Sequence, residues 1–416
     1  MNSFAIADWV GMECLRFLEN MLMAAGYANF GYQDEFKKKF AVGDSVRIKM
    51  PQEFLVTDGF AYTPQAINRQ VTTVNIDNPV QVSFEWDSIE EALELERSRD
   101  EISEQYLRPA IGQIAQEIET RFMEFAFLNT PNVVGTLGAI PTAWTTYATA
   151  RQRMVELATF ANQKNVMAVT PAMMRTMIAN SLTQFNPTDA ISQQYKSGSV
   201  GRAAGYDWFE SMSCQRHTTG IIATQADVDI DGAGQSGSSI LLSCTTGDTF
   251  VAGDIISIAN VNYVNPRTRV STGTNRQFVI TAAATGAASA VTLSIYPSIV
   301  GPGSPYQNVD ALPANDAQVT FWPGTTITDA AASTGSCGLA FNKLAFAAAG
   351  VELMMPSVGG TVKMAVQKRD KNTGFSVAII CDFDSESRKQ INRIDTLFGF
   401  GRLYADKAAV RIASLS

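Results

Sequence analysis

Three aspartates stand at alternating positions ahead of a glycine in the stretch DVDIDGAGQSGS, residues 227–238. This spacing is typical of an EF-hand calcium loop, whose shell of oxygen ligands is closed by a bidentate glutamate at position twelve. Position twelve here is Ser238, and the flanking segments TTGIIATQ and SILLSC are apolar and β-rich where an EF-hand needs helices. The pattern favours an acidic, glycine-rich turn between strands, and another oxygen-rich calcium loop is the alternative.

The single histidine, His217, follows Cys214 in the segment CQRHTTG. A nucleophile–base pair needs the two side chains within hydrogen-bond reach and a third group that orients the base. No family signature for such a pair surrounds this histidine. We interpret His217 as an ordinary loop histidine.

Two further stretches resemble chemical motifs and fail on inspection. The run EEALELERSRDE, residues 90–101, could supply paired carboxylates on one helix face, but its interleaved arginines favour a solvated, ion-paired face. The stretch GFGRLYAD lacks the third glycine and the helix start of a dinucleotide-binding fingerprint. We therefore expect no catalytic residues, no metal site and no cofactor, and a protein that is not an enzyme.

Composition sets the broad class. A length of 416 residues indicates two or three domains. A hydrophobic content of 46% excludes a mostly disordered protein. A formal net charge of −8 argues against a general nucleic-acid-binding face. The five cysteines are scattered, without a C-x-x-C pair, so neither a zinc site nor a disulfide framework is predicted. The N-terminal residues make a poor signal peptide, and no apolar segment is long enough to span a membrane.

The first half of the chain predicts elements that need a neighbour. Apolar residues at helical spacing predict an amphipathic N-terminal helix over residues 4–25, an arm that lies on something else. Strand-like segments separated by turn residues then indicate a protruding hairpin, too small to bury a core alone. Lys37, Lys38 and Lys39 stand before it in FKKKF, as a weak nucleic-acid signal or a guarded strand edge. We expect both arm and hairpin to be completed only by other copies of the chain.

A long helix follows, with a capping box at Ser88 and Glu91 and a restart or kink at Pro109. Its apolar stripe beyond the proline consists of Ile111, Ala115, Ile118, Phe122 and Phe125. Residues 141–222 alternate helical and strand-like pieces, which is typical of an α/β domain.

The remaining sequence changes style twice. Residues 225–323 are rich in Gly, Ser, Thr, Val and Ile and predict an inserted β-barrel or sandwich with strands at 239–245, 254–264, 276–283 and 290–297. Residues 342–356 indicate a return to helix. We expect the strands 361–367, 375–382 and 408–413 to form one C-terminal sheet, with a short helix at 385–394 between them.

This order of parts resembles the major capsid proteins of tailed bacteriophages. The shared architecture is the Johnson fold (HK-ninety-seven-like), in the Salmonella-phage P-twenty-two type that carries an inserted barrel. The local similarities lie at residues 96–128, which resemble the family's spine helix, at CTTGDTFVAGDIISIANV, which resembles a strand of its insert, and at residues 382–412, which resemble its closing segment.

The resemblance implies an α+β phage major-capsid fold in seven segments. They are an N-terminal arm (1–40), an extended β-hairpin loop (41–87), a long spine helix (88–130), an axial α/β domain in two parts (131–224 and 324–357), an inserted small all-β barrel (225–323), and a peripheral sheet with the C-terminus (358–416).

The resemblance also implies a structural protein that self-assembles as hexamers and pentamers into an icosahedral virion capsid around double-stranded DNA. Scaffolding protein and portal would be partners, DNA would be held non-specifically, and assembly would occur in the host cytoplasm, away from any membrane. The hairpin would lie over an adjacent subunit. Asp227, Asp229 and Asp231 would meet basic groups of a neighbour, and Lys37, Lys38 and Lys39 are candidates for a similar contact.

Three alternatives compete with the phage shell. An encapsulin-like cellular compartment protein shares the fold but normally lacks the barrel. A carbohydrate-active enzyme would need two carboxylates about 5 to 10 Å apart in a cleft. A monomeric surface adhesin is disfavoured by the poor signal peptide and the odd number of cysteines.

Overall fold

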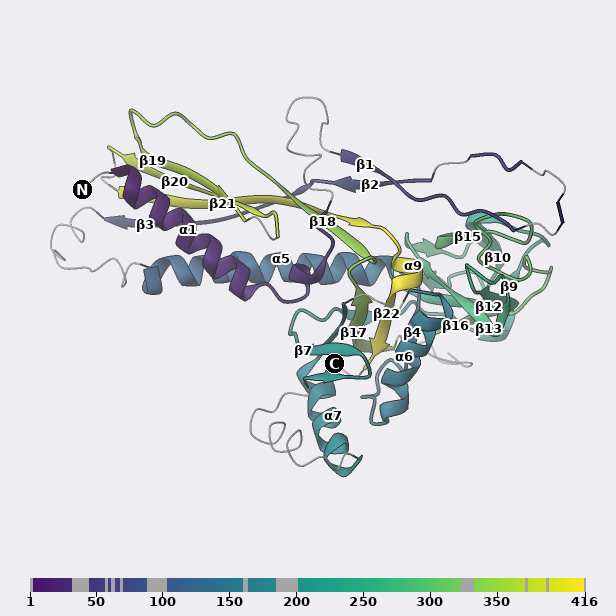
Figure 1. Ribbon diagram of the computed structural model, residues 1–416. Helices are drawn as coiled ribbons and strands as arrows, with labels where there is room; N and C mark the ends of the chain where they lie inside the picture. The colour runs from purple at the N-terminus through teal and green to yellow at the C-terminus, as the bar shows by residue number, and fades with distance from the viewer. Residues whose placement is uncertain are drawn as a thin grey trace. The chain divides into compact units, whose positions relative to one another are not determined.

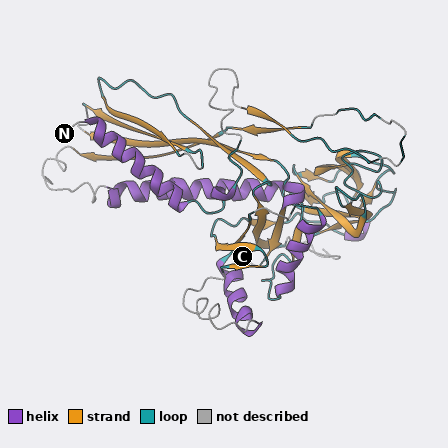
Figure 2. Cartoon of the chain, viewed as in Figure 1, coloured by secondary structure: helices purple, strands orange, loops and turns teal. Residues whose placement is uncertain are grey.

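The chain forms two compact units in a computed structural model (Figures 1 and 2). Unit 1 combines Met1–Ile48, Val71–Phe122 and Phe346–Arg402, and unit 2 combines Lys49–Gln70, Met123–Ala345 and Leu403–Ser416. The structure describes residues 3–31, 45–56, 59–60, 64–67, 70–87, 103–159, 164–184, 201–322, 333–370, 373–386 and 389–414. The seven predicted segment boundaries are a finer division than these two units and stay a prediction.

Unit 1 is built around one long strand, β21 (Lys389–Arg402). Strand β3 (Asn78–Asp87) pairs antiparallel with residues 389–398 from one edge. Strands β20 (Ser376–Asp384) and β18 (Phe346–Val351) both pair with the other edge of β21, one after the other along its length. Strand β3 therefore lies across β21 from both of them. Strand β19 (Val362–Arg369) completes the sheet beside β20. A separate two-stranded sheet is formed by β1 (Ser45–Lys49) and β2 (Val71–Asn75).

Helix α1 (Ser3–Met21) confirms the predicted N-terminal helix, and it contacts β19 and β20 of its own chain. Cys14, Phe17 and Leu18 of this helix are buried. A β-carbon at Gly11 would stand 2.7 Å from Cγ of Lys368, so glycine lets the helix approach the strand closely. The expectation that the arm is completed only by other copies is therefore wrong for α1, because the sheet of its own unit buries its apolar face.

The same correction applies to part of the predicted hairpin, residues 41–87. Strand β3 pairs along its whole length with β21 of the same chain, so the backbone groups on that side are satisfied within the subunit. Among the described residues, its other edge pairs with no strand. Residues 41–44 lie outside the described residues. The connection between β1 and β2, called the loop 49–70 from the last residue of β1 onward, contains no strand in its described residues 50–56, 59–60, 64–67 and 70.

Helix α5 (Arg108–Asn129) confirms the restart predicted at the proline, because a π-helical turn (Ser103–Leu107) precedes it and Pro109 is its second residue. A proline is tolerated there because the first helical N–H groups have no intrahelical acceptor. Four residues of the predicted stripe are buried, among them Phe122, whose ring packs edge-on against Phe346 and Phe400. The capping box at 88–91 lies outside the described residues.

Three sequence predictions for the C-terminal third are wrong. A helix was expected at 385–394, but the described residues from 389 onward form the start of β21. Asn392 and Ile394 are buried, and pairing with β20 and β3 satisfies the backbone hydrogen bonds of the strand. The helix expected within 342–356 is β18, whose alanine-rich residues 346–350 are all buried, so packing overrides their helix propensity. Strand β22 (Ala409–Ala413) belongs to unit 2, apart from β19 and β20.

Unit 2 contains a seven-stranded sheet in the order β4-β22-β17-β5-β7-β6, with β8 also paired to β17. Apolar residues of the helices pack against this sheet in one core. Tyr147 and Met173 of the helices and Trp208 of the sheet belong to it. This arrangement matches the predicted alternation of helices and strands. The elements are β4 (Val133–Gly135), α6 (Trp144–Glu156), β5 (Asn165–Val169), α7 (Pro171–Gln184), β6 (Arg202–Ala203), β7 (Tyr206–Glu210), β8 (Arg216–Thr218), β17 (Thr334–Asn342) and α9 (Ala405–Ala408).

A six-stranded, nearly closed barrel-like sheet lies within unit 2, in the order β16-β12-β13-β15-β10-β9. All four strands predicted for the insert are present. A core of 19 buried residues fills it, including Phe278 and Leu293 with no exposed surface. The elements are a 3-10 turn (Gln225–Asp227), β9 (Asp229–Ile230), β10 (Gly237–Ser243), β11 (Thr249–Phe250), β12 (Ile255–Val264), β13 (Ser271–Ile280), β14 (Ala284–Thr285), β15 (Ala290–Ile299) and β16 (Val319–Phe321).

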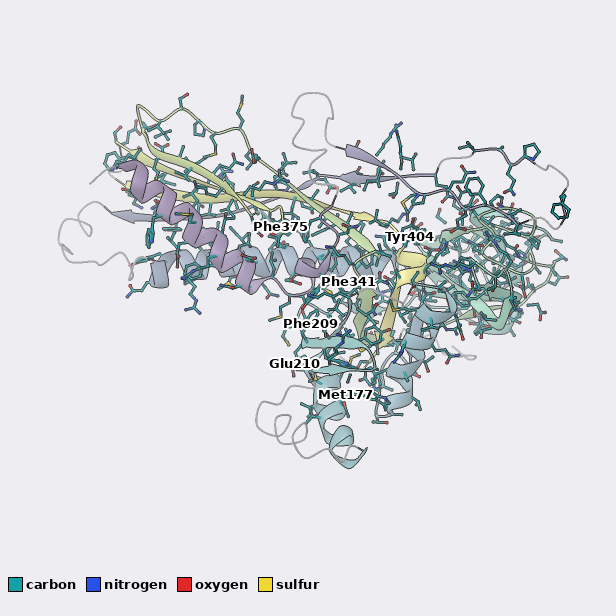
Figure 3. The ribbon with its side chains drawn as sticks, viewed as in Figure 1. Met177, Phe209, Glu210, Phe341, Phe375 and Tyr404 are labelled. Carbon is teal, nitrogen blue, oxygen red and sulfur yellow. The ribbon has the colours of Figure 1, made fainter. Side chains whose placement is uncertain are left out.

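Phe375 in unit 1 and Phe341 in unit 2 are buried aromatic residues, and both are labelled in Figure 3. Phe375 packs edge-on against Phe30 and Phe398. Among the residues that the structure describes, no helix combines the length and hydropathy needed to cross a bilayer.

Candidate assembly surfaces

The three aspartates of the acidic stretch lie on the outer side of the barrel. Val228 and Ile230 alternate with them and are buried in the barrel core. Asp227 and Asp231 are exposed and Asp229 is half-buried. The alternation that resembles a calcium loop is therefore an alternation of buried apolar residues and more exposed aspartates around the short strand β9, with Asp227 in the 3-10 turn before it and Asp231 directly after it.

Backbone hydrogen bonds fix this acidic edge from both sides. Strand β9 pairs with β10, and the N–H of Ile230 donates to the carbonyl of Ala317 at 3.1 Å. The following turn is closed by Gln235, which donates to the carbonyls of Asp231 (2.7 Å) and Leu241 (2.9 Å). The edge is rigid, and its carboxylates point away from the core that supports it.

Lys37, Lys38 and Lys39 and the whole acidic run at 90–101 lie outside the described residues. Over the described part of the chain, no group of three or more His, Cys, Asp or Glu side chains could hold a metal ion.

His217 is not the loop histidine that the sequence indicated. It lies on β8, is buried, and its Nε2 is 2.7 Å from Oδ1 of Asp254. Asp254 also accepts the N–H groups of Gly220 (3.1 Å) and Val251 (2.8 Å). The carboxylate thus joins β8 to the turn that precedes β12, and the pair is a structural connection.

Beside this pair, Arg411 of β22 is a buried cation whose main partners are not carboxylates. Its Nη1 donates to the carbonyl of Gly253 at 2.7 Å, and its guanidinium lies 3.9 Å from the ring centroid of Phe127. Burial lowers the pKa of Arg411 to about 10, while Cys337 and Asp254 act in the opposite direction. This group, too, joins the barrel to the seven-stranded sheet within unit 2.

A buried carboxylate anchors the N-terminal segment within unit 1. Glu119 of α5 accepts the backbone N–H groups of Met23, Ala24 and Ala25, the last two at 3.1 Å. Burial raises the pKa of Glu119 to about 7, although the three N–H groups lower it. The sequence analysis missed this residue, because nothing in a helical Glu signals that its face meets the end of another helix.

The loop 49–70 carries several of the large apolar side chains that are exposed in unit 2. Phe54, Val56, Phe60 and Ile67 are all exposed, Val56 to 96%. The loop is nevertheless ordered from within, because the side chain of Gln65 donates to the carbonyl of Leu55 (2.6 Å) and accepts its N–H (2.9 Å). Four exposed apolar side chains on one loop are a candidate surface for a partner to cover.

The described residues thus present two candidate contact surfaces, an exposed apolar loop and an acidic barrel edge, as expected of a subunit that packs against other chains. The family model described as "P22 coat protein – gene protein 5" matches residues 6–409. The chain belongs to this coat protein family. It is a structural major capsid protein whose copies assemble into the shell of a phage virion.

Solved structures of phage capsids are similar to the chain at low identity. A structure of Mycobacterium phage Che8 has 12% identity, a TM-score of 0.49, and coverage of 94% of this chain and 90% of that one. The capsid of the Cyanophage P-SCSP1u has 14% identity, a TM-score of 0.41, and coverage of 91% and 85%. The CUS-3 coat protein I-domain has 23% identity and a TM-score of 0.19, and covers 23% of this chain and 95% of its own.

No curated protein matches the chain. The comparisons give no support to a cellular compartment shell or a carbohydrate-active enzyme.

Proposed function

We propose that copies of this chain form hexamers and pentamers that close an icosahedral shell around double-stranded DNA. A scaffolding protein and a portal would take part during assembly in the host cytoplasm, and the subunit itself would have no catalytic role. The net charge of −8 supports non-specific enclosure of the genome, since a strongly basic lining would bind the phosphates tightly and oppose packaging and release.

The observation that carries the assembly proposal is the apolar outer face of the loop 49–70. Phe54, Val56, Phe60 and Ile67 are exposed on this loop. Glu53 and Gln65 of the same loop bond to their own chain instead. Burying a Phe or Val side chain is worth about 1.5 to 3 kcal/mol, so four of them covered by an adjacent copy would drive association. The predicted overlap of the hairpin with an adjacent subunit is thus narrowed to this loop.

The double substitution Phe54→Ser and Phe60→Ser tests the overlap. We expect the subunit to stay folded, because neither side chain contributes to a core, while closed shells are lost in negative-stain micrographs of the protein expressed with its neighbouring gene products. Met212→Ser is the matched control, since Met212 is an 81% exposed apolar residue of unit 2 outside the loop. Normal shells from the double variant would refute the overlap.

A second contact is proposed for the acidic edge, where Asp227, Asp229 and Asp231 would meet basic groups of a neighbouring subunit. The outward orientation of the three carboxylates supports this, because charges on a rigid edge steer association and set its register. Replacing all three by Asn should impair shell formation and weaken its salt dependence.

A control for the lost charge uses three exposed carboxylates elsewhere, as Asp77→Asn, Glu124→Gln and Glu210→Gln. Wild-type yield of shells from the Asp227, Asp229 and Asp231 variant would refute the contact. Dissolution of wild-type shells by calcium removal alone would restore the metal interpretation.

A further inference from the structure

One glutamate of the loop 49–70 makes ion pairs with two separate parts of unit 2. Glu53 Oε1 lies 2.9 Å from Nζ of Lys407 in α9, and Glu53 Oε2 lies 3.5 Å from Nη2 of Arg269, in the barrel turn between β12 and β13. The Glu53 side chain is 30% exposed and each cation 19%, so these pairs are screened less than pairs in open solvent.

The barrel holds Arg269 in place independently of the glutamate. Its guanidinium donates to the carbonyls of Gln307 (3.0 Å) and Pro305. The turn that carries it is built by Asn265, whose Oδ1 accepts two backbone N–H groups of the turn and whose Nδ2 donates to the carbonyl of Glu156 at 2.7 Å. The cation is therefore preorganised to receive a carboxylate.

Helix α9, which begins after Tyr404 (Figure 3), holds the second cation and joins it to the same barrel. Asp406 pairs with Arg276 of β13 at 3.4 Å, and Arg276 is 1% exposed. The adjacent Lys407 is fixed through its carbonyl, which accepts the hydroxyl of Thr159 at 2.6 Å. In α9, the negative Asp406 thus binds the barrel and the positive Lys407 binds the loop.

The position of Glu53 determines which side of the loop faces outward. Side chains of an extended segment alternate between two sides. Glu53 and Leu55 are half-buried, whereas Phe54 and Val56 are exposed. Holding the carboxylate against Arg269 and Lys407 therefore turns the apolar side chains away from the subunit.

We propose that Glu53 is a positioning residue that fastens the loop 49–70 to the inserted barrel and to α9, so that the barrel serves as an internal support that presents the loop's apolar face to a second copy of the chain. The identity of the occupant rests on the proposed assembly function. The fastening itself is a property of the single subunit and is tested on it.

Glu53→Gln keeps the shape of the side chain and removes both ion pairs. In the unassembled subunit we expect hydrogen exchange over residues 50–56 to become about tenfold faster, because charge-assisted bonds hold this leg of the loop. Exchange in β12 and β15 should not change, which verifies that the barrel is folded. Glu85→Gln is the matched control, since it breaks the exposed pair with Lys389 (2.6 Å) in unit 1.

A second variant separates the ion pairs from the glutamate itself. Lys407→Met should accelerate the same exchange by a smaller factor, and combining it with Glu53→Gln should add nothing beyond Glu53→Gln alone. We also expect fewer closed shells from Glu53→Gln than from Glu85→Gln.

Unchanged exchange over residues 50–56 in Glu53→Gln would overturn the proposal, and so would faster exchange accompanied by normal shells. If the wild-type chain formed no shells while exchange responded as expected, the fastening would be supported and the assembly function would fall separately.

Discussion

The barrel and the loop 49–70 belong to the same unit and place their side chains in opposite ways. The barrel turns its apolar residues inward, with Phe278 and Leu293 fully buried, and exposes Asp227 and Asp231 of its acidic edge. The loop turns Glu53 and Gln65 toward its own chain and Phe54 and Val56 outward. A segment with a core is stable alone, whereas a segment held by polar contacts with its apolar side in water is complete only in an assembly.

The largest difference between the two regions is expected from truncating one phenylalanine in each. Phe278→Ala should destabilise the subunit by about 3 to 5 kcal/mol, because it leaves a cavity in the barrel core. Phe60→Ala should change the free energy of unfolding by less than about 0.5 kcal/mol, as is usual for surface positions. Urea denaturation of the unassembled subunit measures both, and equal effects would contradict the division into a self-sufficient barrel and a dependent loop.

The N-terminal segment is an intermediate case, since α1 has an apolar face on β19 and β20 but its end is held by the buried carboxylate of Glu119. The pKa of Glu119 is raised to about 7 in the folded chain from 4.5, so the folded state binds the proton more tightly. Its contribution to stability is complete below pH 4.5 and is lost as the pH rises to about 7, by about 3 kcal/mol at most.

Glu119→Gln removes this titration while keeping an acceptor for the backbone N–H groups of residues 23–25. We expect the fall in unfolding free energy between pH 5 and 8 to be smaller in the variant than in the wild type. Thermal or urea unfolding across that range measures the difference, and parallel pH profiles would contradict the role of Glu119.

The smallest effect is expected inside the loop. Gln65→Ala removes two hydrogen bonds to Leu55, each worth about 1 kcal/mol, from a segment that contributes little to the core. Hydrogen exchange at Leu55 should rise several-fold while the global unfolding transition stays unchanged. A lowered transition would show that the loop contributes to the core of unit 2.

Elements with a strong local period were predictable from the sequence. The stripe that includes Ile111 and Phe122 predicted α5, and the clusters of β-branched residues predicted the barrel strands, because burial on one face imposes periods of 3.6 and 2. Residues 346–350 and 389–394 were predicted wrongly as helix, since their strand state depends on pairing between β18, β20, β3 and β21, which are distant in the sequence.

The candidate surfaces divide in the same way. The aspartates at 227–231 were predicted as an acidic, glycine-rich turn between strands of the insert. Their supports, Gln235 and the carbonyl of Ala317, were not predictable. Glu53, Arg269 and Lys407 carry no local signal, because each is an ordinary charged residue until the fold brings the three together.

The sequence by itself determined the order of parts, the periodic helices and strands, the separate β-rich insert and the membership of a capsid family, since these depend on local patterns and on the chain as a whole. Only the tertiary structure decided which apolar surface the chain covers for itself and which it leaves exposed. The reason is physical: α1 and β3 find partners in the sheet of unit 1, whereas the ion pairs of Glu53 hold the loop 49–70 with its apolar side in water.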